Sequence, residues 1–150
     1  MTVKLKKDME ESMKFNSSVC TSIEQSQRLL ELGLKPETAD MYYHEGSEDG
    51  AGNIEFHRNI RTECNNILFP DYIPAWSLHR LIELLPQDIH LDDYADTHYY
   101  LTIDPFKVIY VNSHRLWIYQ RDEGCLYDKL VDTIEWTIKN NFFNKQYLKQ

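Results

Sequence analysis

The sequence predicts an α+β fold, an antiparallel strand meander packed with flanking helices in a single domain. Apolar residues recur at helical spacing in 74–86 and in 127–138, whereas they alternate with polar residues in much of the chain between these segments. The chain has 150 residues, of which 42% are hydrophobic. A chain of this length and composition can bury enough surface to fold without disulfides or a structural metal.

Residues 1–17 are polar and mixed in charge, so we expect a flexible N-terminal arm followed by the α+β domain over 18–150. Glycine and acidic residues dominate 45–53, which predicts a mobile loop. The stretch 54–69 fits neither a helical nor a strand period, and it carries no assignment.

The first predicted helix spans 22–32. Two overlapping capping boxes, one starting at Thr21 and one at Ser22, mark its beginning, and Gly33 marks its end. Pro36 then favours a short helical turn, and the residues at 41–43 favour an extended piece.

The segment 74–86 begins and ends with proline and predicts a second, packed helix. Its leucines and isoleucine at i, i+3, i+4 and i+7 form one apolar face, at Leu78, Leu81, Ile82 and Leu85.

Period-two alternation and turn residues predict three consecutive strands, over 97–103, 108–111 and 115–120. A last helix follows the turn at Gly124. It is predicted from an apolar stripe at Tyr127, Leu130, Val131, Ile134 and Ile138, and we expect it to cover one face of the sheet.

The net charge of −8 is concentrated in two acidic blocks, 37–55 and 83–104, which carry −6 each and contain no lysine or arginine. The other charged residues are spread thinly and form no basic stripe, so direct nucleic-acid binding is not expected. A solvated surface is the ordinary explanation of such blocks. The alternative is an acidic mimic of nucleic acid, which requires both blocks to share one face.

The three cysteines are far apart and include no CxxC pair, which argues against a disulfide framework and a cysteine zinc site and favours a reducing, cytoplasmic setting. No apolar stretch is long enough to cross a membrane. A thiol and imidazole pair, Cys64 with His57 or Cys125 with His114, would need the fold to bring its members together.

No nucleotide-binding glycine pattern or serine elbow is present, and no cofactor is predicted. The enzyme alternative is a metal-dependent hydrolase that uses the imidazoles and carboxylates of His90, Asp92, Asp96 and His98. These residues fall in a segment with loop character, where the sequence alone does not aim them at one point.

Aromatic residues exceed what a small core needs if both faces of the meander are counted. An outward row that includes Trp117 and Tyr119 would resemble the aromatic anchors of a protein interface, and Trp136 lies beside the apolar stripe of the last helix. We therefore predict Trp117, Tyr119 and Trp136 as partner-binding residues. The alternative is that the first two helices cover the second face of the sheet and bury these rings.

The motifs Glu-Leu-Gly-Leu-Lys-Pro-Glu-Thr-Ala-Asp-Met at 31–41 and Pro-Ala-Trp-Ser-Leu at 74–78 resemble those of small uncharacterised proteins of phages, prophages and other mobile elements of Bacteroides-type gut anaerobes. The resemblance covers most of 20–140. It implies a genomic setting and no catalytic residue. The function expected from the sequence is thus a non-enzymatic binding or accessory protein that contacts a protein partner or a second copy of itself.

Overall fold

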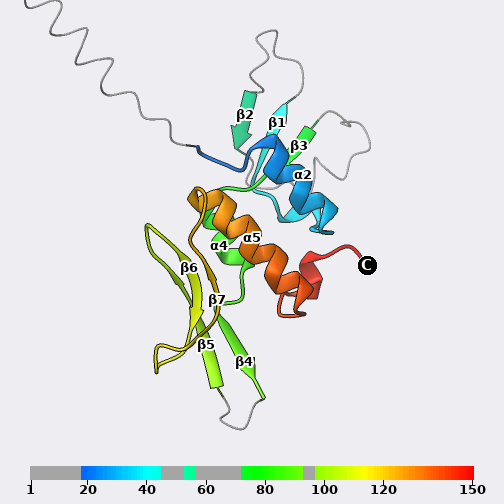
Figure 1. Ribbon diagram of the computed structural model, residues 1–150. Coiled ribbons are helices and arrows are strands. Elements are labelled where there is room, and N and C mark those ends of the chain that lie inside the picture. The colour runs from blue at the N-terminus through cyan, green and yellow to red at the C-terminus, as the bar shows by residue number, and fades with distance from the viewer. Residues whose placement is uncertain (1–17, 45–52, 57–71, 93–96) are drawn as a thin grey trace, which may run out of the picture.

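The computed structural model describes residues 18–44, 53–56, 72–92 and 97–150 and has the predicted α+β architecture (Figure 1). Its helices are α2 (Ile23–Glu31), α4 (Leu78–Leu84) and α5 (Leu126–Lys139), with short 3-10 turns η1 (Pro36–Thr38) and η2 (Lys145–Tyr147). Its strands are β1 (Met41–His44), β2 (Asn53–Phe56), β3 (Tyr72–Ala75), β4 (Asp88–Leu91), β5 (Thr97–Ile103), β6 (Val108–Val111) and β7 (Trp117–Arg121).

Two antiparallel sheets contain all the described strands. One has the order β2-β1-β3 and the other the order β4-β5-β6-β7, so the second is a meander in which each strand pairs with the next along the chain. In Figure 1, α5 lies between the two sheets. None of the helices in the described ranges combines the length and apolarity needed to cross a bilayer.

Helix α2 begins and ends as its capping residues predict. The Ser22 hydroxyl accepts a hydrogen bond from the Gln25 backbone N–H at 3.1 Å, and the Gln25 side chain accepts one from the Ser22 N–H at 2.9 Å. Gly33 follows the helix with a φ of 94°, a left-handed conformation that glycine adopts without steric cost. Of the two predicted capping boxes, the structure has the one that starts at Ser22.

The helix predicted over 74–86 is shorter than expected, because its first residues belong to a strand. Pro74 lies in β3, which is an edge strand of the sheet that the described residues form, and an edge strand tolerates proline because one side of it needs no N–H donor. Helix α4 starts after Ser77, whose hydroxyl accepts from the Arg80 N–H at 3.2 Å. Asp40 holds Ser77 in place by accepting from its backbone N–H at 2.8 Å.

One hydrophobic core connects α2, α4 and α5 with the inner side of the four-stranded sheet. Its fully buried members include Leu29 of α2, Leu81 of α4, Ile134 of α5 and Val108 of β6. Trp76, between β3 and α4, is 0% exposed and belongs to the same cluster. The segments with helical periodicity therefore supply most of this core.

The C-terminal segment returns to the end of α2. Leu148 forms an antiparallel bridge with Leu34, and the backbone N–H of Lys35 donates to the Tyr147 carbonyl at 2.8 Å. The Lys149 N–H donates to the Gly33 carbonyl at 2.8 Å. These bonds join the C-terminal segment through backbone groups to the residues that follow α2.

Ion pairs connect α5 to α2 and β7. Arg28 of α2 pairs with Asp132 at 2.7 Å and with Glu135, and Arg121 of β7 pairs with Asp132 at 2.7 Å. Lys139 pairs with Glu135 at 2.5 Å. The neighbouring Lys139 and Arg28 lower the pKa of Glu135 below its usual value, since both favour the ionised carboxylate.

Acid is expected to weaken the fold through Glu135. The pKa of Glu135 in the folded protein lies below its unfolded value of about 4.3. The ionised Glu135 therefore stabilises the fold above that pH, and this stabilisation is lost as the pH falls through the folded pKa. Chemical denaturation at several pH values between about 7 and 3 should show Glu135→Gln losing about 0.5–1 kcal/mol at neutral pH and much less near pH 3. An equal loss at both pH values would contradict this account.

Candidate functional site

The four-stranded sheet has an open side, which we call the outer face. Along β5, Tyr99 is 8% exposed and points to the core, whereas His98, Tyr100 and Thr102 alternate with the inward residues and are exposed. On β4, Ile89 is buried and His90 is exposed, and His90 is the cross-strand partner of His98. The outer face is thus the side away from α5. Its residues on β4 and β5 named here are exposed, whereas Ile109 of β6, the cross-strand partner of Thr102, is buried on the same face.

A row of cross-strand partners, three of them apolar, crosses the outer face from strand to strand. The Cα partners in this row are Asp88, Tyr100, Val111 and Trp117, one from each strand. Tyr100 is 51% exposed and Trp117 is 59% exposed. Two large aromatic side chains therefore stand in solvent on either side of Val111, although burial of either would be favourable.

His90 and His98 lie next to this row and are direct cross-strand partners. The expectation that they belong to a loop is wrong, because β4 and β5 form an antiparallel hairpin that sets them opposite each other. Their rings stack with centroids 4.4 Å apart, and the His98 and Tyr100 rings are 6.3 Å apart. His98 Nδ1 lies 2.8 Å from Asp88 Oδ2.

The predicted metal ligands are only partly brought together. His90 Nδ1 lies 3.6 Å from Asp92 Oδ1, whereas Asp96 lies outside the described residues. Within the described part of the chain, no group of three or more histidine, cysteine, aspartate or glutamate side chains is placed to hold a metal ion. The metal-dependent hydrolase remains a hypothesis that rests on the His90 and His98 pair.

Trp117 and Tyr119 lie on opposite faces of the sheet, so the outward row expected to contain both is wrong. Trp117 is opposite Val111 and Tyr119 is opposite Tyr110, and the irregularity between these pairs inserts Ile118 as an extra residue. The same exposed Trp117 also contradicts the alternative that the first two helices cover this face.

Tyr119 and Trp136 lie together between the sheet and α5. Their ring centroids are 4.6 Å apart, and Trp136 also stacks on Tyr110 at 5.8 Å. Both side chains are half-buried, and burial raises the pKa of the Tyr119 phenol. Of the three predicted partner-binding residues, Trp117 is therefore the one that stands in solvent.

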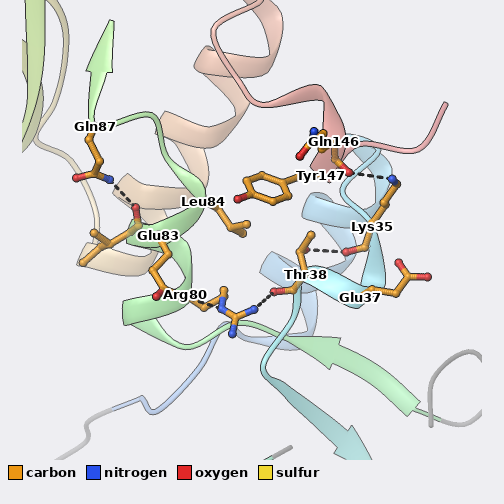
Figure 2. A pocket seen from close by; sticks show the side chains of 10 residues that line it. Lys35, Glu37, Thr38, Arg80, Glu83, Leu84, Gln87, Gln146 and Tyr147 are labelled. Carbon is orange, nitrogen blue, oxygen red and sulfur yellow. Dashed lines mark hydrogen bonds and ion pairs between the residues drawn. The ribbon is translucent and has the colours of Figure 1, made fainter. Parts of the chain in front are cut away.

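A cavity of about 1060 Å³ lies where η1, α4 and η2 meet (Figure 2). The Arg80 guanidinium donates to the Thr38 carbonyl at 3.0 Å, and the Lys35 ammonium donates to the Gln146 carbonyl at 2.8 Å. The Tyr147 ring also lines the cavity (Figure 2). Both cations thus hold the cavity walls together, and among the described residues that line the cavity there is neither histidine nor cysteine for nucleophilic catalysis.

The two cysteines in the described part of the chain, Cys20 and Cys125, are not arranged as activated nucleophiles. Cys20 is buried, its thiol donates to the Tyr43 hydroxyl at 3.4 Å, and burial raises its pKa, so the neutral thiol is favoured. Cys125 caps α5 and contacts Asp128 Oδ2 at 3.2 Å rather than His114. Cys64 and His57 lie outside the described residues.

The acidic blocks also lie partly outside the described residues, which leaves the mimic hypothesis untested. Among the described members, Asp40 accepts a hydrogen bond from the Ser77 backbone N–H. Asp104 accepts from the backbone N–H groups of Phe106 and Lys107 at 2.8 and 2.9 Å. These carboxylates have local structural partners.

Comparison of the chain with models of protein families, with curated proteins and with solved structures finds no match. The candidate site therefore rests on geometry alone. Sequence reasoning missed Tyr100 as an exposed anchor, although the alternation over 97–103 places it on the same side as His98. It missed β4 altogether, and with it the partner of His98.

Proposed function

We propose that this chain is a non-enzymatic binding protein that holds a protein partner on its outer face. The observation that supports the proposal is the pair of solvent-exposed rings, Tyr100 and Trp117, in one cross-strand row with Val111. Tyrosine and tryptophan bury a large area with few rotatable bonds, which is why they are common at the centres of interfaces.

Charge indicates what kind of partner fits. The residues of the outer face on β4, β5 and β6 include the carboxylate of Asp88, and Asp92 follows β4, but there is no lysine or arginine among them. A partner that combines apolar side chains with lysine or arginine would place cations near these carboxylates and over the Tyr100 and Trp117 rings. We therefore propose a partner with a basic contact surface.

The resemblance of 31–41 and 74–78 to proteins of phages and mobile elements supports an accessory role in such an element. In that setting, the proposed partner is a protein of the element or of its host.

The proposal predicts that Trp117→Ala and Tyr100→Ala each lower partner affinity about 10-fold or more, because both remove a central aromatic anchor. Tagged protein would be used to capture partners from the cells that encode the chain, and the affinity of any recovered protein would then be measured with purified components.

Phe106→Ala is the matched control, because Phe106 is 77% exposed but lies in the turn after β5, away from the row. It should bind as the wild type does. Equal binding by all three variants, with circular dichroism showing each to be folded, would rule out the outer face as the contact surface.

One observation favours a second candidate, the metal-dependent hydrolase, because His90 and His98 are cross-strand partners and Asp88 contacts His98 Nδ1. This candidate requires zinc, manganese or nickel to raise the melting temperature in the wild type and not in His98→Ala. His114→Ala is the matched control, since His114 is an exposed histidine outside the pair. No shift with any of these metals would remove the candidate.

A further inference from the structure

The cavity where η1, α4 and η2 meet combines a buried floor with a polar rim. Thr38 and Leu84 are its buried members, and Tyr147 is half-buried among the lining side chains. Four exposed polar side chains also line it, at Glu37, Glu83, Gln87 and Gln146. The volume of about 1060 Å³ is at the upper end of the range of about 300–1,000 Å³ that is typical of small-molecule sites. The cavity is therefore large enough for a small ligand that enters from solvent.

Arg80 presents oriented hydrogen-bond donors to this cavity. Its Nη1 donates to the Thr38 carbonyl at 3.0 Å, and its Nε lies 3.1 Å from Glu83 Oε2. Figure 2 shows the guanidinium held between these two residues. A guanidinium carries five N–H groups in one plane, and no contact between described residues uses Arg80 Nη2. The remaining N–H groups are thus fixed in direction and open to a further acceptor.

The carboxylates of the lining do not use up these donors. Glu83 contacts Arg80 Nε through one oxygen, and its other oxygen lies 3.2 Å from His79 Nε2. Glu37 is exposed, and in Figure 2 its carboxylate points away from Arg80. Lys35 adds further donors, because its contact with a backbone carbonyl uses one of its three N–H groups. The two cations and two carboxylates of the lining leave it without net charge, so the oriented donors rather than net charge select a ligand.

We infer that this cavity binds a small organic anion, with its carboxylate on Arg80 and its apolar body against Leu84 and Tyr147. A carboxylate supplies two acceptors that match the plane of a guanidinium, and hydrogen bonds between charged groups are stronger than neutral ones. An apolar body that displaces water from the floor adds a favourable contribution. The inference does not depend on the proposed protein partner, because the residues that line the cavity lie outside the four-stranded sheet.

Three small molecules of one shape test the class of ligand. 3-Phenylpropionate carries the carboxylate, 3-phenylpropionamide is neutral and 3-phenylpropylamine is a cation. We expect 3-phenylpropionate to bind with a Kd of about 1 mM or below. The amide should bind about 10-fold more weakly or worse, since it lacks the charge-assisted bonds, and the amine should bind most weakly.

NMR of the indole N–H groups measures this binding and locates it. The Trp76 indole donates to the Thr38 hydroxyl at 3.0 Å, directly behind the cavity floor, so its signal should shift on titration with 3-phenylpropionate. Trp117 is the internal reference, because it lies on the outer face and its signal should stay in place.

Arg80→Gln removes the guanidinium and should weaken binding of 3-phenylpropionate about 10-fold or more, with much less effect on the amide. Arg115→Gln is the matched control, because it makes the same change at an exposed arginine that does not line the cavity. It should bind both molecules as the wild type does. Circular dichroism would show that each variant is folded.

Ile82→Trp provides a second test that leaves Arg80 in place. Ile82 is half-buried in the lining, so a larger side chain there should occupy the cavity and abolish binding of both the carboxylate and the amide. This variant decides the matter if Arg80→Gln does not fold.

A Trp76 signal that does not move at ten times the expected Kd would overturn the inference and leave the outer-face proposal untouched. A shift of the Trp117 signal alone, or an amide that binds as tightly as the carboxylate, would overturn it as well. Undiminished binding of 3-phenylpropionate by folded Arg80→Gln or Ile82→Trp would do the same.

Discussion

Replacing Trp76 by alanine is expected to lower the free energy of unfolding by about 3–5 kcal/mol, a large part of the stability of a domain of this size. Trp76 is 0% exposed within the main core. Its indole N–H donates to the Thr38 hydroxyl at 3.0 Å, and its backbone N–H donates to the Thr21 hydroxyl at 3.0 Å. The substitution removes the ring that joins β3, η1 and α2 and leaves a cavity there.

Urea denaturation followed by circular dichroism would measure this loss. Trp76→Phe is the control, because it keeps most of the buried apolar area and loses the bond to Thr38, which is worth about 1 kcal/mol. It should therefore lie between the wild type and Trp76→Ala. A loss below about 1 kcal/mol for Trp76→Ala would contradict a central place for this residue in the core.

Replacing Tyr110 by alanine should also cost about 3–5 kcal/mol, since it removes a large ring that is 0% exposed. Tyr110 of β6 stacks on Trp136 of α5 with ring centroids 5.8 Å apart, and its hydroxyl donates to the Pro86 carbonyl at 2.7 Å. The substitution should therefore loosen the four-stranded sheet from α5.

Tyr110→Phe separates the two contributions, because it retains the stacked ring and loses only the hydrogen bond. We expect it to cost about 1 kcal/mol in the same denaturation experiment. If Tyr110→Phe were as destabilising as Tyr110→Ala, the hydrogen bond to the Pro86 carbonyl rather than ring packing would govern stability here.

The elements that the sequence predicts well are those with a local cause. The Ser22 capping box and Gly33 bound α2 as expected, and the apolar stripe of 127–138 forms α5. These signals are contained in a few neighbouring residues, so no tertiary contact is needed to interpret them.

The elements that the sequence predicts poorly depend on distant partners. Strand β4 has four residues and becomes recognisable only through its pairing with β5. Pro74 suggests the start of a helix, but pairing with β1 places it in a strand. The start of α4 depends on Asp40, which is distant in sequence and holds Ser77 in position.

The candidate site shows the same division. The alternation of 115–120 predicts an outward row that includes Trp117, and Trp117 is exposed, because period-two alternation is a local property. The sequence also predicts Tyr119 to share that face, but the insertion of Ile118 turns it inward. A single extra residue in one strand changes the facing of every residue after it, and sequence alternation alone does not report such an insertion.

The backbone bridge between Leu34 and Leu148 has a consequence for synthesis on the ribosome. The end of α2 leaves the exit tunnel early, but its last partners, Tyr147 and Lys149, are translated long afterwards. The end of α2 therefore lacks these backbone partners until residues 147–149 have emerged, and contacts of such sequence separation slow folding. The bridge between Leu34 and Leu148 can thus form only after the helices and strands between them have been synthesised.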